Sequence, residues 1–231
     1  MNKKMIVSVL VLFLMGISAH SQSRSFGIKG GVSISNFWGD GMDNLNNQIS
    51  LDEKNLLWGV ISLYSTKEFL PDLISLQSEL VYSRSGKRWS GTIGGNDVDF
   101  RINADNISMP WLMKLNLPVI MRPSIYFGPQ VSWMFRARVE DLSSSIASQP
   151  FFTSIDRTAG NTLFERYVNV IDIGFTTGLD FTIPLGPGSA VIDLRYNQGF
   201  INVFNFEEGD DVHNYSFHIM AGYQLDFGSG F

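Results

Sequence analysis

Apolar and polar residues alternate along much of this chain, and the alternation is clearest near its C-terminus. Successive side chains of a β-strand point to opposite faces, so alternation predicts a strand with one apolar and one polar face. Residues 213–227 fit this pattern throughout. One face carries Tyr215, Phe217, Ile219, Ala221, Tyr223, Leu225 and Phe227, and the other carries Ser216, His218, Met220, Gly222, Gln224 and Asp226.

The same alternation recurs upstream, where it predicts six further strands. An eighth segment, residues 55–65, is apolar on both faces, so it predicts a strand but leaves the register open. After the N-terminal segment no apolar run approaches the ~20 residues of a membrane-spanning helix. The strands that we predict are residues 25–36, 55–66, 72–85, 105–117, 122–136, 168–182, 189–200 and 213–227.

The connections between these strands are alternately short and long. Residues 66–71, 118–121 and 184–188 are short and contain prolines, whereas 37–54, 86–104, 137–167 and 201–212 are long. This asymmetry is typical of outer-membrane barrels, which have short periplasmic turns and longer extracellular loops. Since the strand number is even, both termini are expected in the periplasm. Aromatic residues near the strand ends fit an interfacial girdle: Trp58, Tyr64, Tyr82, Trp111, Trp133 and Tyr215.

The fold class that we predict is therefore all-β, an eight-stranded antiparallel up-and-down transmembrane β-barrel of small size. The alternative is a soluble β-sandwich or lipocalin-like barrel, which would also alternate. A soluble protein would carry many charged residues on the exposed face of its strands. Here the strand charges are few and share the parity of the glycines, which favours a narrow, crowded barrel interior.

The N-terminus carries the features of an export signal. Lys3 and Lys4 precede an apolar stretch at residues 5–17, and small Ala19 and Ser21 favour cleavage before Gln22. As a helix, that stretch spans only about 20 Å, less than a hydrocarbon core of about 30 Å. We therefore predict a signal peptide at residues 1–21 and one barrel domain at residues 22–231.

Charge and cysteine content limit the covalent links and the binding partners that we expect. The chain has no cysteine, which excludes disulfides and a lipidated N-terminal cysteine. Removal of Lys3 and Lys4 leaves fifteen basic and twenty-two acidic residues, a formal charge of −7. Nucleic acid is not expected as a partner because phosphate binding needs a basic surface. The expected partners are outer-membrane lipid and lipopolysaccharide, the barrel-insertion machinery and an outer-membrane protein.

Six groups of short motifs follow one another and cover nearly the whole mature chain. They are Phe26-Gly27-Ile28-Lys29-Gly30-Gly31 with Ser35-Asn36, Leu76-Gln77-Ser78-Glu79-Leu80-Val81-Tyr82-Ser83 with Gly86, Ile107-Ser108-Met109-Pro110 with Lys114, Tyr126-Phe127-Gly128-Pro129, Asp172-Ile173-Gly174-Phe175, and Arg195-Tyr196-Asn197-Gln198-Gly199. With these motifs the chain resembles the PorT-like outer-membrane β-barrel proteins of Bacteroidota. The resemblance implies an eight-stranded barrel and no activity, although the eponymous member is tied to protein secretion. It leaves open whether Phe227 or Phe231 is the terminal aromatic residue.

Charged residues on the polar parity form the main candidate site. An eight-stranded barrel has room only for side chains inside, and a buried charge must be paired. We therefore expect a structural ion-pair network that plugs the lumen, with a solute path as the alternative. Lys29 is expected to pair with Asp226 or Glu79. The network comprises Lys29, Glu79, Lys114, Arg136, Asp172, Asp180, Asp193, Arg195 and Asp226.

No residue set predicts a catalytic, cofactor or metal site. His213 lies at a strand end and His218 faces the lumen by parity, where membrane lipid cannot reach it. The acidic residues 207–211 lack the ligand spacing of a Ca²⁺ loop and fit a solvated loop tip. We expect a non-enzymatic barrel that acts through its long loops, linked to secretion or envelope integrity. The alternatives are a small channel or apolar-solute conduit and, more remotely, a lipid-modifying enzyme. Loop contacts are predicted at Phe37, Trp38, Phe151 and Phe152.

Overall fold

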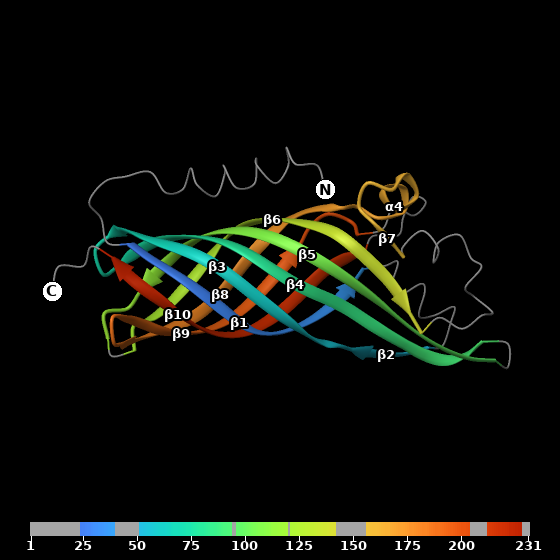
Figure 1. Cartoon of the computed structure of the whole chain (residues 1–231), viewed down its shortest axis with the longest axis horizontal. Coiled ribbons are helices and arrows are strands. Elements are labelled where there is room, and N and C mark those ends of the chain that lie inside the picture. Colours follow the sequence, from blue (N-terminus) through green and yellow to red (C-terminus); the bar gives the residue numbers. More distant parts are fainter. Residues whose placement is uncertain are drawn as a thin grey trace.

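The computed structural model describes residues 24–39, 51–93, 96–119, 121–141, 156–203 and 212–227. Within these ranges eight long strands form a closed antiparallel ring (Figure 1). The predicted signal peptide, the acidic residues 207–211, Phe151, Phe152 and Phe231 lie outside the described residues. The ring strands are β1 (Arg24–Trp38), β3 (Leu57–Leu70), β4 (Ile74–Ile93), β5 (Asn96–Asn116), β6 (Pro123–Glu140), β8 (Ile171–Leu185), β9 (Gly188–Gly199) and β10 (His213–Phe227).

Neighbours in the ring are neighbours in sequence, and two pairings close it. β10 pairs with β1 from Phe227 opposite Arg24 to His213 opposite Trp38, which joins the last strand to the first. β4 pairs with β5 along almost their entire length. Every pair is antiparallel, so the predicted eight-stranded up-and-down barrel is confirmed. A closed ring leaves no edge strand with unsatisfied backbone groups in lipid.

The outward-facing residues form the apolar belt that the alternation predicts. In β3, whose register the sequence left open, Leu57, Ile61 and Leu63 are exposed while Val60 and Tyr64 are buried. No helix in the described part of the chain combines the length and apolarity needed to cross a bilayer. The belt includes Phe26, Ile28, Val32, Ile34, Leu76, Tyr82, Trp111, Met113, Leu115, Ile125, Phe127, Ile173, Leu179, Ile192, Leu194, Phe217, Ile219 and Leu225.

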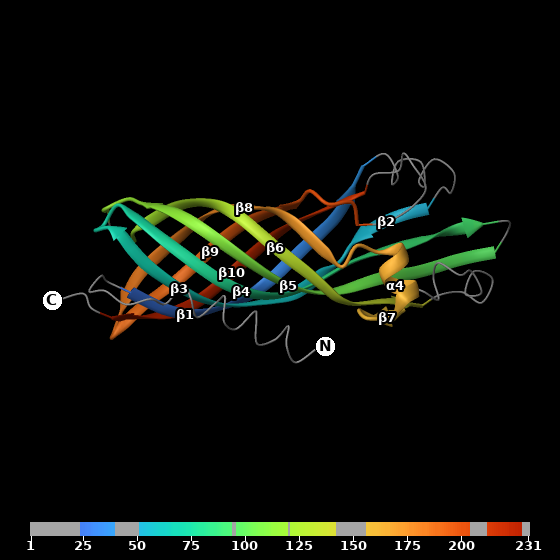
Figure 2. The same cartoon turned by 90° about the horizontal axis from the view of Figure 1, so that it is seen from above.

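The three short connections gather at one end of the barrel (Figures 1 and 2). The β3–β4 turn places Asp72 at a positive φ of 58°, a conformation that aspartate tolerates better than most residues. The β8–β9 turn uses Gly186 at φ 65°, followed by Pro187. The β8–β9 turn lies within the predicted connection at residues 184–188, whereas β3 continues to Leu70, so the β3–β4 turn lies at residues 71–73 and not at the predicted 66–71.

The opposite end is more elaborate than predicted. Residues 86–104 were expected to form a loop, but β4 and β5 continue as a paired two-stranded arm beyond the barrel (Figure 2). β2 (Leu51–Asn55) pairs with this arm, and β7 (Arg157–Thr158) pairs with β6. A short helix, α4 (Thr162–Tyr167), lies beside β7 and is capped by the Asn161 side chain, which accepts hydrogen bonds from Leu163 and Phe164.

An apolar cluster joins these elements at the loop end. Inward residues of the arm, Trp89 and Phe100, stack with ring centroids 5.2 Å apart. They belong to one buried cluster with residues from β1 and β6, from α4 and the residue after it, and from the connection between β9 and β10. This packing explains why the arm is a strand pair and not a loop. The buried members are Phe37, Trp89, Phe100, Ala137, Phe164, Val168, Val203 and Val212.

Candidate functional site: the polar lumen

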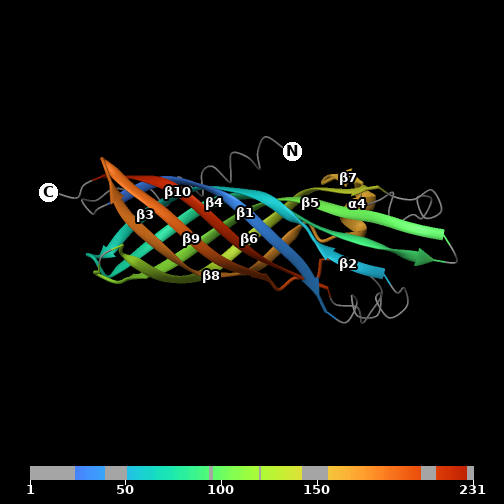
Figure 3. The ribbon, with the colours of Figure 1, turned by 90° about the horizontal axis from the view of Figure 1, so that it is seen from below.

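Four fully buried charged residues meet across the middle of the barrel. Lys29 comes from β1, Glu79 from β4, and Asp193 and Arg195 from β9, each at most 3% exposed. The alternation of side chains points all four toward the barrel interior. Because the ring is closed, β1, β4 and β9 surround the same lumen (Figure 3). We call this set the central ion-pair layer.

The contacts within the layer are short and reciprocal. Arg195 donates two hydrogen bonds to Glu79, at 2.8 and 2.7 Å, and one to Asp193 at 2.9 Å. Lys29 Nζ lies 3.0 Å from Glu79 Oε1 and 2.5 Å from Asp193 Oδ2. Two positive and two negative groups therefore neutralise one another. Such pairing is what allows charges to stay buried, because an isolated buried charge costs several kcal/mol.

Neutral side chains satisfy the remaining atoms of the layer. Tyr126 donates to Asp193 Oδ1 at 2.6 Å and accepts from Arg195 Nε at 3.2 Å. Ser62 donates to Glu79 Oε2 at 2.9 Å. Gly178 leaves the space that the Tyr126 ring fills, since a Cβ at this glycine would lie 2.4 Å from the tyrosine hydroxyl. The layer and its hydrogen-bonding partners thus connect side chains from β1, β3, β4, β6 and β9 across the lumen.

A second ion pair lies on the turn side of this layer. Lys114 Nζ is 2.6 Å from Asp180 Oδ2 and donates to Gln77 Oε1 at 3.1 Å. Gln77 in turn donates its amide to Glu79. The glutamine therefore connects the second pair to the central layer. All these residues are buried, so charged and polar contacts run without a break along this part of the axis.

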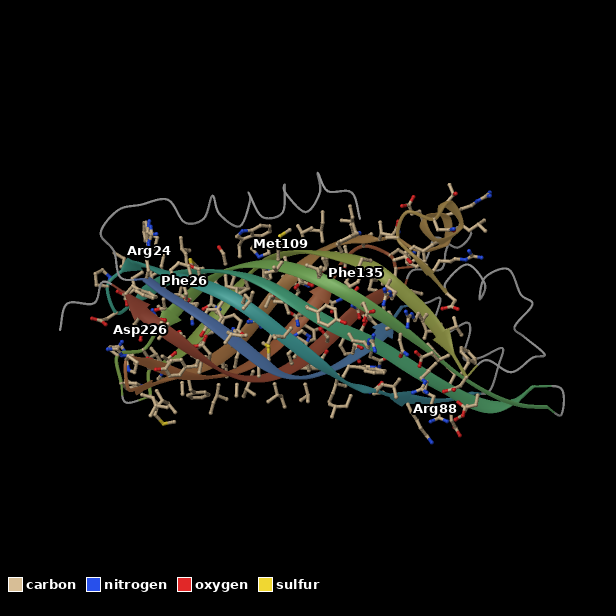
Figure 4. All side chains as sticks on the ribbon, viewed as in Figure 1. Arg24, Phe26, Arg88, Met109, Phe135 and Asp226 are labelled. Carbon is tan, nitrogen blue, oxygen red and sulfur yellow. The ribbon has the colours of Figure 1, made fainter. Side chains whose placement is uncertain are left out.

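Of the nine charged residues predicted for the lumen, the structure brings six together: Lys29, Glu79, Lys114, Asp180, Asp193 and Arg195. The predicted pairing of Lys29 with Glu79 forms, whereas that of Lys29 with Asp226 does not. Asp226 lies opposite Ser25, four residues or about 13 Å along β1 from Lys29. It accepts hydrogen bonds from Ser25 at 2.6 Å and Ser189 at 2.9 Å, near the turn end (Figure 4).

The other two predicted lumen residues, Asp172 and Arg136, do not join this group. Asp172 is half-buried at the loop end of β8, where it lines the lumen as predicted and accepts backbone hydrogen bonds from Phe200 at 3.2 Å and Ile201 at 3.0 Å. The prediction for Arg136 is wrong, because a β-bulge in β6 changes the parity just before it. Asn106 pairs with Met134 but Asp105 pairs with Arg136, which moves the Arg136 side chain to the outer face.

A small polar cavity lies between the central layer and the apolar cluster. Its volume is about 50 Å³, room for a few water molecules, and Ser33, Ser83, Asn106, Gln130 and Ser132 are among the lining residues. Asn197, Ser216 and His218, which contact one another, also line the cavity. The Ser216 hydroxyl lies 3.1 Å from His218 Nε2, and Asn197 Nδ2 donates to that hydroxyl at 3.1 Å.

The turn end of the lumen is much wider. A polar vestibule of about 980 Å³ lies inside the short turns. Glu68, Asp72, Arg122 and Asp226 are among its lining residues, and Lys114 lies at its inner end. Along its axis the lumen therefore consists of an open vestibule, two ion-pair levels, the small polar cavity and, at the loop end, the apolar cluster, which we call the apolar cap.

The predicted loop contacts have different environments. Phe37 is 8% exposed and belongs to the apolar cluster, so it packs inside the cap. Trp38 is half exposed and its ring lies 5.2 Å from that of His213. Phe151 and Phe152 lie outside the described residues.

The outer face of the arm carries charged residues that were predicted to lie in a loop. Arg88 and Asp99 form an exposed ion pair across β4 and β5, well beyond the apolar belt (Figure 4). The hydrogen bond from Arg88 holds the pKa of Asp99 below its ordinary value. Arg101 contacts Glu140 at 3.2 Å and Asp141 at 2.7 Å. These pairs lie on the surface and contribute little stability.

Sequence reasoning missed the neutral residues that complete the layer, notably Tyr126, Gln77 and Ser62. Tyr126 and Gln77 hold the inward parity of their predicted strands, so the signal was present, whereas Ser62 lies in the segment whose register the sequence leaves open. A list restricted to ionisable residues could not include them. Parity together with hydrogen-bonding capacity would have found them.

The family match agrees with this architecture. The family described as outer membrane protein beta-barrel domain matches residues 20–205. Among proteins of curated function, none matches this sequence. Solved structures of similar shape include OprG from Pseudomonas aeruginosa, at 14% identity over 88% of this chain and 97% of that chain, with a TM-score of 0.44. Neisserial surface protein A has 15% identity over 87% and 96%, with a TM-score of 0.43. The Yersinia pestis protein Ail has 18% identity over 89% and 99%, with a TM-score of 0.32.

The family match covers most of the chain and includes seven of the eight ring strands. It agrees with the closed ring, the outward apolar belt and the inward polar residues. The chain belongs to the outer membrane protein β-barrel domain family and is an outer-membrane β-barrel protein.

Proposed function

We propose that this protein is a non-enzymatic barrel with a closed lumen, which acts as a structural or interaction protein through its loop end. The single observation that carries the proposal is the central ion-pair layer, whose four charged groups are buried and fully paired. The apolar cap beyond it supports the same conclusion, because a solute would have to cross both barriers.

The proposed orientation puts the short turns and both termini in the periplasm and the arm outside the cell. It rests on the usual asymmetry of turns and loops in such barrels. The arm is the feature best placed to meet a partner, since it extends beyond the barrel with charged residues on its outer face. The resemblance to PorT-like proteins supports a link to secretion or envelope integrity.

Site-specific cross-linking in native outer membranes tests the interaction role. A photo-reactive amino acid replaces Arg88 on the arm and, as the control, Asp72 in the β3–β4 turn. We expect a discrete cross-linked protein from position 88 and none of the same mass from position 72. No adduct from the arm, or the same adduct from both ends, contradicts the proposal. Protease cleavage of the arm in intact cells tests the orientation separately.

The vestibule of about 980 Å³ favours a second candidate, a small channel or conduit whose inner barrier opens under some condition. Single-channel conductance separates the two candidates. An enzyme is less well supported, because the cavity beside His218 is too small for a lipid chain. If the purified protein hydrolyses phospholipid or lipid A, and His218→Ala abolishes that activity, the non-enzymatic assignment is wrong.

A further inference from the structure

The outer face of β6 changes from apolar to strongly basic at the bulge. Trp133 precedes the bulge and Phe135 is its extra residue; both rings lie on the lipid-facing side, with centroids 5.7 Å apart. After the bulge Ala137 and Val139 point inward and pack in or against the apolar cluster. Arg136 and Arg138 therefore point outward. Bulges commonly redirect a side chain in this way, and without this one Arg136 would point into the lumen.

These two arginines differ from the outward-facing arginines of β4 and β5 at the same end of the barrel. Arg84, Arg88 and Arg101 each contact a carboxylate. Within the described ranges, the side chains of Arg136 and Arg138 make no hydrogen bond or ion pair. Asp105, which lies opposite Arg136 in the sheet, is already held by Arg84 at 2.7 Å and by Tyr82 at 3.0 Å.

A surface groove of about 490 Å³ lies over the two arginines, between β6 and β7. It is lined by Arg136, Arg138 and Arg157, with Glu140 and Asp156 as its carboxylates. Glu140 is engaged by Arg101. The groove therefore carries an excess of positive charge in a chain whose overall charge is negative.

The position of the groove relative to the membrane suggests its ligand. The rings of Tyr82 and Phe135 lie 6.3 Å apart and continue the aromatic group that ends the apolar belt. Aromatic belts mark the headgroup level of a bilayer. Arg136 and Arg138 follow Phe135 by one and three residues, about 3–10 Å along the strand. Their guanidinium groups thus lie at the level of lipid phosphates.

We propose that Arg136 and Arg138 bind the phosphate groups of lipid A in the outer leaflet. Guanidinium groups suit this ligand because they donate paired hydrogen bonds to phosphate oxygens, and the apolar belt directly below contacts acyl chains. The proposal rests on the orientation given under the proposed function. It does not depend on the interaction role of the arm.

Binding of two lipids by the refolded full chain in detergent tests the proposal. The probes are diphosphorylated lipid A and the same lipid with both phosphates removed, and the readout is native mass spectrometry. We expect the phosphorylated form to bind more tightly. Arg136→Gln and Arg138→Gln should each weaken its binding about fivefold, because a basic residue near an anionic lipid surface contributes about that factor.

Arg88→Gln is the matched control, since it removes the same charge from the same end of the molecule but away from the groove. Its affinity should equal that of the native chain. Loss of the heat-modified band on electrophoresis would identify a variant that fails to fold. The proposal is overturned if both lipids bind equally, or if the Arg88 variant loses as much affinity as the other two. Cleavage of the arm only from the periplasmic side would overturn the orientation while leaving binding in detergent unchanged.

Discussion

Replacement of Glu79 by alanine perturbs the central ion-pair layer most directly. Its carboxylate accepts from Arg195 at 2.8 and 2.7 Å, from Lys29 at 3.0 Å and from Ser62 at 2.9 Å. Without it, Lys29 and Arg195 share only Asp193, which leaves one buried positive charge uncompensated. Breaking a buried pair in this way costs about 3–5 kcal/mol.

The assay is urea unfolding of the protein in lipid vesicles, followed by tryptophan fluorescence. Glu140→Ala is the matched control, because Glu140 forms an exposed pair with Arg101, and loss of such a pair costs about 0–1 kcal/mol. A double variant, Glu79→Met with Arg195→Met, removes one positive and one negative charge and leaves Lys29 paired with Asp193. Its free energy of unfolding should lie close to that of the native chain, since apolar replacement of a buried pair is often neutral.

The reasoning is refuted if Glu79→Ala costs no more than Glu140→Ala. It is also refuted if the double variant is as unstable as Glu79→Ala, because the loss would then come from packing and not from an unpaired charge. Lys29→Ala gives an independent measure, since it removes a positive group from the same layer. We expect a lower melting temperature for this variant as well.

Further predictions concern the lumen packing and the arm. Gly178→Ala should destabilise the barrel by about 1–3 kcal/mol, since the new Cβ would lie 2.4 Å from both the Leu194 carbonyl oxygen and the Tyr126 hydroxyl, whereas Gly59→Ala has open space and should change the urea midpoint little. Because Arg88 lowers the pKa of Asp99, this ion pair stabilises the arm above the ordinary aspartate pKa of about 4 and the stabilisation is lost as pH falls through the lowered value. An NMR titration of the Asp99 carboxyl should give a midpoint below that of the Arg88→Gln variant, and equal midpoints would contradict this account.

Much of the fold follows from a single regularity. A strand whose side chains alternate can face the membrane in only two ways. The apolar face is stable against lipid and the polar face is stable in the crowded interior, so one of the two is selected. The positions of Lys29, Glu79, Asp193 and Arg195 inside the lumen therefore follow from parity. Which of these residues contact one another does not, because that depends on how far each strand is shifted relative to its neighbours.

Two features, the bulge in β6 and the arm, were not predicted from the alternation of apolar and polar residues. Phe135 is the extra residue of a bulge, and nothing in the alternation around it marks the change, so Arg136 was assigned to the wrong face. The arm was expected to be a loop, although residues 99–104 alternate polar and apolar. Its inward residues Trp89 and Phe100 pack against Phe164 of α4, a contact between distant segments that local pattern does not reveal.

The central claim, a lumen closed by the ion-pair layer and the apolar cap, is tested most directly by single-channel recording in planar bilayers. The refolded native chain is added to the bilayer, and insertion is verified by the heat-modified band of the recovered protein. We predict no unitary conductance above the background of the bare bilayer. Discrete, reproducible conductance steps from the native chain would contradict the sealed lumen and favour the channel.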